Sequence, residues 1–91
     1  YRLYQNYPNP FNPNTTIPFK LKERAYVKVM VYDIKGEMLK VLVNETKEAG
    51  YYETEFNGSG FASGIYLYRI EVIGQGNIPV YMEMKKMILV K

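Results

Sequence analysis

The side chains that most often do chemistry in proteins are missing from this 91-residue chain, which contains neither His nor Cys. The common general bases, thiol nucleophiles and transition-metal ligands are therefore unavailable. Without cysteine no disulfide framework can form, and the redox compartment is left open. The sequence thus predicts a protein that is not an enzyme, with no catalytic residue, no metal site and no cofactor.

Two acidic residues and one glycine-rich run still need a chemical interpretation. Glu53 and Glu55 lie two apart on one strand face, where they could form a glycosidase carboxylate pair or bind calcium. Nothing nearby supplies a cleft or further oxygen ligands at a recognisable spacing, which favours a solvated strand face. The run GSGFASG, residues 58–64, superficially matches a phosphate-binding loop, but it lacks the lysine and opens no helix. A turn is predicted there.

The ten tyrosines offer a third kind of chemistry, which is stacking against sugars or single-stranded nucleic acid. Tyr26, Tyr32 and Tyr51 are predicted to face outward and are the candidates for such a platform. Tyr52, Tyr66 and Tyr68 are predicted to face inward, and tyrosine is also a common filler of pleated surfaces. The net charge of +3, without any cluster of five like charges, disfavours nucleic acid as a partner.

The elements that would position these side chains are short strands, because apolar and polar residues alternate with a period of two. Strands are predicted over residues 15–21, 26–32, 38–43, 51–56, 64–73 and 80–90. The stretch from Glu37 to Glu48 also fits a helical spacing, and a strand is the interpretation taken. Pro18 places the first strand on a sheet edge, because proline donates no ladder hydrogen bond. Asp33 and Gly36 predict a type I turn that reverses the chain.

These strands, with turn signals every eight to twelve residues and no convincing helix, predict the fold. It is all-β, an antiparallel immunoglobulin-like β-sandwich of about seven short strands. One domain over residues 1–91 is expected, with a Pro- and Asn-rich strap over 1–14 and the sandwich over 15–91. In the run NYPNPFNPNTTIPF the prolines and asparagines exclude a helix, and Phe11 is the expected anchor. The chain begins without Met, so we expect it to be a piece of a longer precursor.

Several short blocks, taken in order, resemble a known family. The blocks are NYPNPFNP followed by TTI, then VKVMVYDIKGE, AGYYETEFNGSGFASGIYLYRI and a terminal KKMILVK. Together, from about Leu3 to Lys91, they resemble the type A C-terminal sorting domain of type IX secretion (Por secretion) cargo. This kind of domain is similar in fold to the immunoglobulin-like domain of flagellar hook-capping proteins.

The resemblance implies a β-sandwich at the C-terminus of a larger secreted protein of a Gram-negative bacterium. Such a domain directs its cargo from the periplasm through the outer-membrane type IX translocon to the cell surface or the medium. A sortase-like peptidase then usually removes the domain. The implied partners are the translocon, this peptidase and an upstream cargo domain, with no nucleic acid among them.

The motif residues of the family can be carried over by position. Those with an expected structural role are Asn9, Pro10, Phe11, Asn12, Pro13, Gly36, Gly50, Gly64, Tyr66, Tyr68 and Arg69. The residues expected to be recognised by the translocon form the basic terminal element: Lys85, Lys86, Met87 and Lys91. Where the family often has His and Trp in the strand after Gly50, this chain has Tyr52 and Phe56.

Recognition is expected through strand addition at the last hairpin together with positive charge, unless the lysines only protect an edge from aggregation. Two further functions stay open. One is a structural subunit of an extracellular filament or oligomer that self-associates through edge strands. The other is a carbohydrate-binding accessory module.

Overall fold

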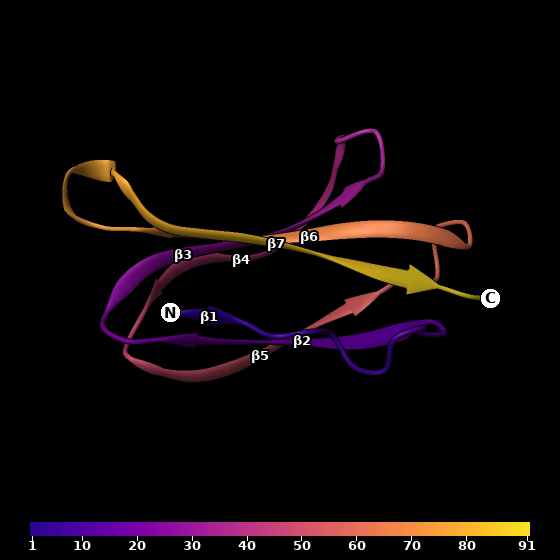
Figure 1. Cartoon of the computed structure of the whole chain (residues 1–91), viewed down its shortest axis with the longest axis horizontal. Helices are drawn as coiled ribbons and strands as arrows, with labels where there is room; N and C mark the ends of the chain where they lie inside the picture. The colour runs from indigo at the N-terminus through magenta and orange to yellow at the C-terminus, as the bar shows by residue number, and fades with distance from the viewer.

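The computed structural model describes residues 1–91 as two antiparallel sheets packed face to face (Figure 1). The three-stranded sheet has the order β1-β2-β5, with β1 at Arg2–Leu3, β2 at Asn14–Leu21 and β5 at Gly50–Asn57. The four-stranded sheet has the order β4-β3-β6-β7, with β3 at Ala25–Asp33, β4 at Met38–Lys47, β6 at Gly64–Ile73 and β7 at Pro79–Leu89. A short 3₁₀ turn, Gln75–Asn77, joins the last two strands. The predicted seven-stranded sandwich is confirmed.

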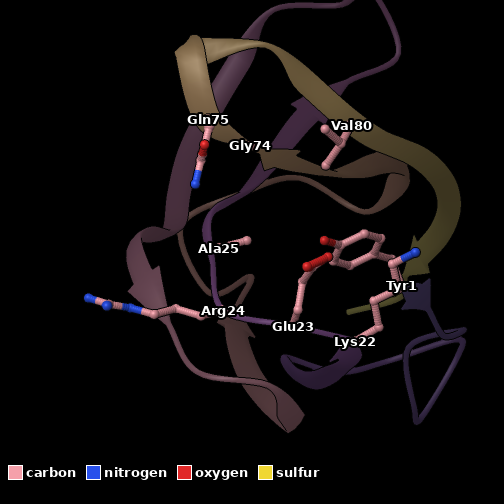
Figure 2. Close-up of a pocket in the computed structure, with 8 residues that line it drawn as sticks. All are labelled: Tyr1, Lys22, Glu23, Arg24, Ala25, Gly74, Gln75 and Val80. Carbon is pink, nitrogen blue, oxygen red and sulfur yellow. The ribbon is translucent and has the colours of Figure 1, made fainter.

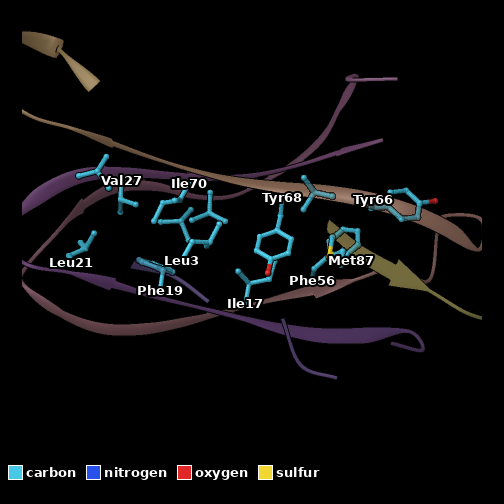
Figure 3. Close-up of a cluster of buried hydrophobic side chains, with 14 of the residues drawn as sticks. Leu3, Ile17, Phe19, Leu21, Val27, Phe56, Tyr66, Tyr68, Ile70 and Met87 are labelled. Atoms are coloured by element: carbon cyan, nitrogen blue, oxygen red, sulfur yellow. The ribbon is translucent and has the colours of Figure 1, made fainter. Parts of the chain in front are cut away.

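The core fills the space between the two sheets (Figure 3). The alternating residues of each strand supply it, as the period-two pattern requires. The fully buried side chains include Ile17, Phe19 and Leu21 of β2, Val27 and Val29 of β3, Tyr68 and Ile70 of β6, and Met87 and Leu89 of β7. Period-two alternation places Met30 on the outer face of β3, but it is 7% exposed, and the hydroxyl of Tyr32 lies 3.5 Å from its sulfur.

The strand β2 lies in the centre of its sheet, so the prediction that it forms an edge is wrong. The two-residue strand β1 pairs with it through Arg2↔Lys20 and Leu3↔Phe19. Such a short strand shows no periodicity, which is why the sequence does not reveal it. The proline in β2 is tolerated because the Pro18 carbonyl accepts the Tyr4 N–H at 3.0 Å, just past the end of β1.

A side chain replaces the hydrogen bond that Pro18 cannot make. In an antiparallel pair, the N–H and C=O of one residue point to the same neighbour, so the missing donor of Pro18 faces Tyr4. The carbonyl of Tyr4 instead accepts the hydroxyl of Tyr68, at 2.8 Å. The same hydroxyl accepts the N–H of Asn6, also at 2.8 Å. Tyr68 of the four-stranded sheet therefore holds in place the segment that follows β1 of the three-stranded sheet.

Residues 5–13 of the strap pass from β2, where Tyr7 forms a bridge with Thr16, to the free edge of β7. Phe11 forms an isolated parallel bridge there, donating its N–H to the Ile88 carbonyl and accepting the Val90 N–H, both at 2.9 Å. The side chain of Asn9 accepts the Ile88 N–H at 2.9 Å. The Phe11 ring is buried and meets the Phe56 ring edge-on at 6.0 Å. The strap thus acts as a short extra strand beside β7.

The β3–β4 hairpin turns as the sequence predicts. Asp33 accepts the N–H groups of Lys35 and Glu37 on one carboxylate oxygen, both at 2.9 Å. Gly36 adopts a φ of +90°, which glycine reaches without steric cost. The ambiguous segment after this turn is a strand, and it continues to Lys47, four residues beyond the predicted end.

Candidate recognition surface

The four residues expected to be recognised by the translocon do not form one surface. Met87 is fully buried in the core. Lys85 lies 3.3 Å from the Glu83 carboxylate, with both side chains about one-third exposed. Lys86 is exposed, while the Lys91 ammonium donates to the Ser59 carbonyl at 2.6 Å. Recognition by these residues stays a prediction, and only the lysines among them offer polar groups to a partner.

The outer edge of β7 is partly covered and partly open. Antiparallel strands present successive residues to alternate sides, and the strap bonds to Ile88, so Met82, Met84 and Lys86 also face away from β6. Gln5 donates to the Lys86 carbonyl at 2.9 Å. We find no protein partner for the N–H groups of Met82, Met84 and Lys86, or for the carbonyls of Met82 and Met84. We call residues 82–86 the open window of β7.

An apolar strip runs along the same strand. Ile78 is 63% exposed, and Val80, Met82 and Met84 are each about half exposed. Arg69 of β6 lies beside this strip, with its guanidinium 3.1 Å from the Met82 sulfur and 2.5 Å from the Glu71 carboxylate. Arg69, Met82, Glu83 and Met84 line a shallow hollow of about 280 Å³. The open window therefore combines unpaired backbone with exposed methionine side chains.

A larger hollow of about 490 Å³ lies at the end of the sandwich, between the β2–β3 turn and the start of β7 (Figure 2). Tyr1 and Glu23 lie side by side in it, while Arg24 points away and pairs with Glu48 at 3.2 Å. Burial, followed by the charge and hydrogen bond of Glu23, raises the pKa of Tyr1. The hollow is lined by both positively and negatively charged side chains, so it does not favour one class of charged ligand.

Tyr26, Tyr32 and Tyr51, the candidates for a platform that stacks against sugars, do not form one. Tyr26 and Tyr32 lie on β3 of one sheet, whereas Tyr51 lies on β5 of the other. The neighbour of Tyr51 is Tyr4, whose ring is inclined at 66° to it, so the two rings offer no flat stacking surface. Tyr66 and Tyr68 face inward, as predicted, and Tyr52 is partly buried against the core.

Glu53 belongs to an exposed hydrogen-bond cluster on the three-stranded sheet. Tyr7 and Tyr51 both donate to one of its carboxylate oxygens, at 2.6 and 2.9 Å. These bonds, the one from Tyr7 first, hold the pKa of Glu53 below its ordinary value. The hydrogen bond to Glu53 is also the largest cause that raises the pKa of Tyr7 to about 12. The cluster joins the strap to β5, and no third acidic side chain completes a metal site.

One buried and one partly buried tyrosine make the fold sensitive to alkali. Burial raises the pKa of Tyr68 to about 12, and burial together with a hydrogen bond to Glu83 does the same for Tyr81. A raised folded pKa gives stability that is complete below the unfolded pKa of 10.0 and is lost as pH rises toward 12. We expect the urea midpoint to fall over this interval, and less so in Tyr81→Phe. An unchanged slope in that variant would contradict the assignment.

The remaining motif residues have structural positions. Gly50 and Gly64 begin β5 and β6, and the Pro13 carbonyl accepts the Gly58 N–H at 2.8 Å. The Tyr66 hydroxyl donates to the Ala62 carbonyl at 2.5 Å and so anchors the loop before β6. Pro10 and Asn12 are exposed, on either side of the buried Phe11. Asn6, which holds Pro8 and Thr15 through its side-chain amide, is a residue that the sequence reading does not single out.

Comparisons with known proteins agree with this architecture. A family model described as "Secretion system C-terminal sorting domain" matches residues 5–88. No curated protein matches the chain significantly. No helix of the structure is long and apolar enough to cross a membrane.

Two solved structures share the fold. CopC from Methylosinus trichosporium OB3b is 11% identical, with a TM-score of 0.56 over 96% of this chain and 90% of its own. PorZ of Porphyromonas gingivalis, described as an essential bacterial surface component of the type-IX secretion system, is 22% identical with the same TM-score. The match with PorZ covers 98% of this chain but 11% of PorZ. At these identities the likeness concerns the fold alone.

Proposed function

The chain belongs to the family of secretion system C-terminal sorting domains, and from this membership we infer that it directs a larger cargo through the outer-membrane type IX translocon. The family match over residues 5–88 is the observation that carries the inference. In this proposal the domain is a non-catalytic signal, and its cargo reaches the cell surface or the medium of a Gram-negative bacterium. A sortase-like peptidase then removes the domain.

The open window of β7 is the surface that we assign to the translocon. A component that serves many cargoes must bind features that do not depend on the cargo, and unpaired backbone groups are such a feature. An extended segment can add to the edge at Met82 and Met84 through main-chain hydrogen bonds. Lys86 adds positive charge at the C-terminal end of the window, and Lys91 adds positive charge past the end of β7. Met87 supports the strand from inside the core.

Export of a fused reporter tests the proposal. Residues 1–91 are joined to the C-terminus of a periplasmic reporter in a host with a type IX system, and reporter in the medium or on the cell surface is measured. Removing Met84 to Lys91 is expected to abolish export. Because this truncation also removes the buried Met87 and Leu89, a second variant that keeps the core is needed.

The second variant is Lys86→Glu combined with Lys91→Glu, which reverses the charge at the C-terminal end of the open window and past the end of β7. Its matched control is Lys35→Glu with Lys40→Glu, which makes the same change of net charge at exposed positions of the β3–β4 hairpin. We expect the first pair to lower export several-fold and the control to export normally. Unchanged export of the truncated chain would overturn recognition through the last strand. Equal loss in both charge variants would remove the role of the two C-terminal lysines.

A further inference from the structure

The open window has two boundaries, and both are built into the fold. At the C-terminal side the strap occupies the edge, because the Phe11 N–H donates to the Ile88 carbonyl and the Asn9 side chain accepts the Ile88 N–H. At the N-terminal side the register slips, since Val72 pairs with Tyr81 while Ile73 pairs with Pro79. Val80 is thus an extra residue, and a bulge bends its strand and ends regular pairing. Regular, unoccupied edge is left over residues 82–86.

This window is complementary to a second copy of itself. If two windows pair in the antiparallel sense about Met84, residue 82 of one copy lies opposite residue 86 of the other. Glu83 then lies opposite Lys85 of the second copy, on both sides of the two-fold axis. These are non-hydrogen-bonded positions, where side chains lie closest and opposite charges stabilise a pair. A register shift that places Glu83 of one copy opposite Glu83 of the other is disfavoured, because the two like charges repel each other.

The same pairing satisfies the free backbone. Met84 of one copy lies opposite Met84 of the other, and the two residues exchange both of their main-chain hydrogen bonds. On either side of this pair, Met82 of one copy bonds to Lys86 of the other in the same way. The Lys86 carbonyl can keep its bond to Gln5, because a carbonyl oxygen has two lone pairs. Met84, which is 47% exposed, lines the hollow beside Arg69 and is covered when the second strand arrives. In this register Val80 lies opposite Ile88, where the strap of the other copy is bound, and the bulge at Val80 ends regular pairing at that point.

The other edge strands of the sandwich are poorly suited to pairing with a second copy. The edge strand β4 carries exposed Lys40, Asn44 and Glu45, and its pairing with β3 slips twice. The edge strand β1 has two residues, and β5 exposes Glu53 and Glu55. Short edges, charges and bulges are the usual devices against strand addition. Each chain has one open edge, and this edge pairs with the same edge of a second chain about a two-fold axis. The assembly therefore stops at two copies.

We propose that two copies of this chain associate side by side through the open windows of β7, in the antiparallel register centred on Met84, to form a continuous eight-stranded sheet. The contact closes as a dimer and gives no filament. It does not rest on the proposed export function, because it is measured on the purified chain. It uses the surface assigned to the translocon, so a dimer hides that surface until it dissociates.

Disulfide trapping tests the register directly, because the chain has no cysteine of its own. In Met84→Cys the two introduced thiols meet at a hydrogen-bonded pair, where Cα atoms lie about 5.5 Å apart, within the range of a disulfide. In the matched variant Met82→Cys the two thiols are four residues out of register, roughly 13 Å along the strands. Met84→Cys is expected to form covalent dimers about tenfold faster or more than Met82→Cys under mild oxidation.

Sedimentation velocity over a concentration series provides the second measurement. Met84→Pro removes an N–H that points away from β6, so the intramolecular sheet is kept while the dimer is lost, and circular dichroism checks the fold. Met84→Ala keeps the N–H and retains the dimer. Glu83→Lys weakens association, and adding Lys85→Glu restores it. Equal crosslinking of the two cysteine variants, faster crosslinking at position 82, or a wild-type chain that stays monomeric at all concentrations would each overturn the proposal.

Discussion

Phe11→Ala is expected to remove about 3 to 5 kcal/mol of unfolding free energy, the usual cost of deleting a buried phenylalanine ring. The ring is 1% exposed and fills the space between the strap, Phe56 and the end of β7. A domain of this length has a total stability of roughly 5 to 13 kcal/mol, so the variant is expected to sit close to its unfolding transition. Urea denaturation followed by circular dichroism measures the loss as a lower midpoint.

Two further variants control for this result. Phe11→Leu keeps most of the apolar volume and is expected to lose less than half as much stability. Ile34→Ala removes a side chain that is 68% exposed and is expected to change stability by about 0.5 kcal/mol or less. A loss in Phe11→Ala as small as that of Ile34→Ala would show that the strap does not contribute to the core.

Tyr68→Phe is expected to cost about 2 to 4 kcal/mol although the ring stays in place, because two backbone groups lose their partner. The hydroxyl donates to the Tyr4 carbonyl and accepts the Asn6 N–H, and the Tyr68 and Asn6 residues are almost completely buried. An unpaired buried donor or acceptor costs more than the net value of the hydrogen bond that it lost. The change appears as a lower urea midpoint with an unchanged slope.

Tyr26→Phe is the matched control for the hydroxyl. The Tyr26 hydroxyl donates to the Asn44 side chain in an exposed hydrogen bond, so its removal leaves water as an alternative partner. We expect a change of about 0.5 kcal/mol or less. If both tyrosine variants lose the same amount, the hydroxyl of Tyr68 does not organise the strap as described above.

The sequence predicts the strands well where their surroundings are simple. The residues of β3 and β6 alternate in polarity because each strand has one face in the core, and their inward residues are identified correctly apart from Met30. The turn at Asp33 and Gly36 follows from local backbone chemistry, so it needs no knowledge of the rest of the fold. The anchor role of Phe11 is also visible, since it is an aromatic residue within a polar run.

What depends on contacts between distant segments is not visible in the sequence. The central position of β2 depends on β1, which is two residues long. The strap covers β7 from Ile88 onward and leaves residues 82–86 open, a division that no local pattern records. Tyr26, Tyr32 and Tyr51 each look exposed by alternation, but alternation does not say that they belong to different sheets. The same limit applies to Met87 and Lys86, which are adjacent in sequence and have opposite environments.

The bonds between the strap and the last strand also determine when the domain can fold. Asn6 is hydrogen-bonded to Tyr68, and Phe11 is hydrogen-bonded to Ile88 and Val90. The strap can therefore make these bonds only after β6 and β7 have been synthesised. Loop closure over such separations is slow, and β-sandwiches fold among the slower small domains. A chain emerging from the ribosome therefore stays unfolded in this region until β7 and the residues just after it have left the ribosome, so this domain folds as a unit and not segment by segment.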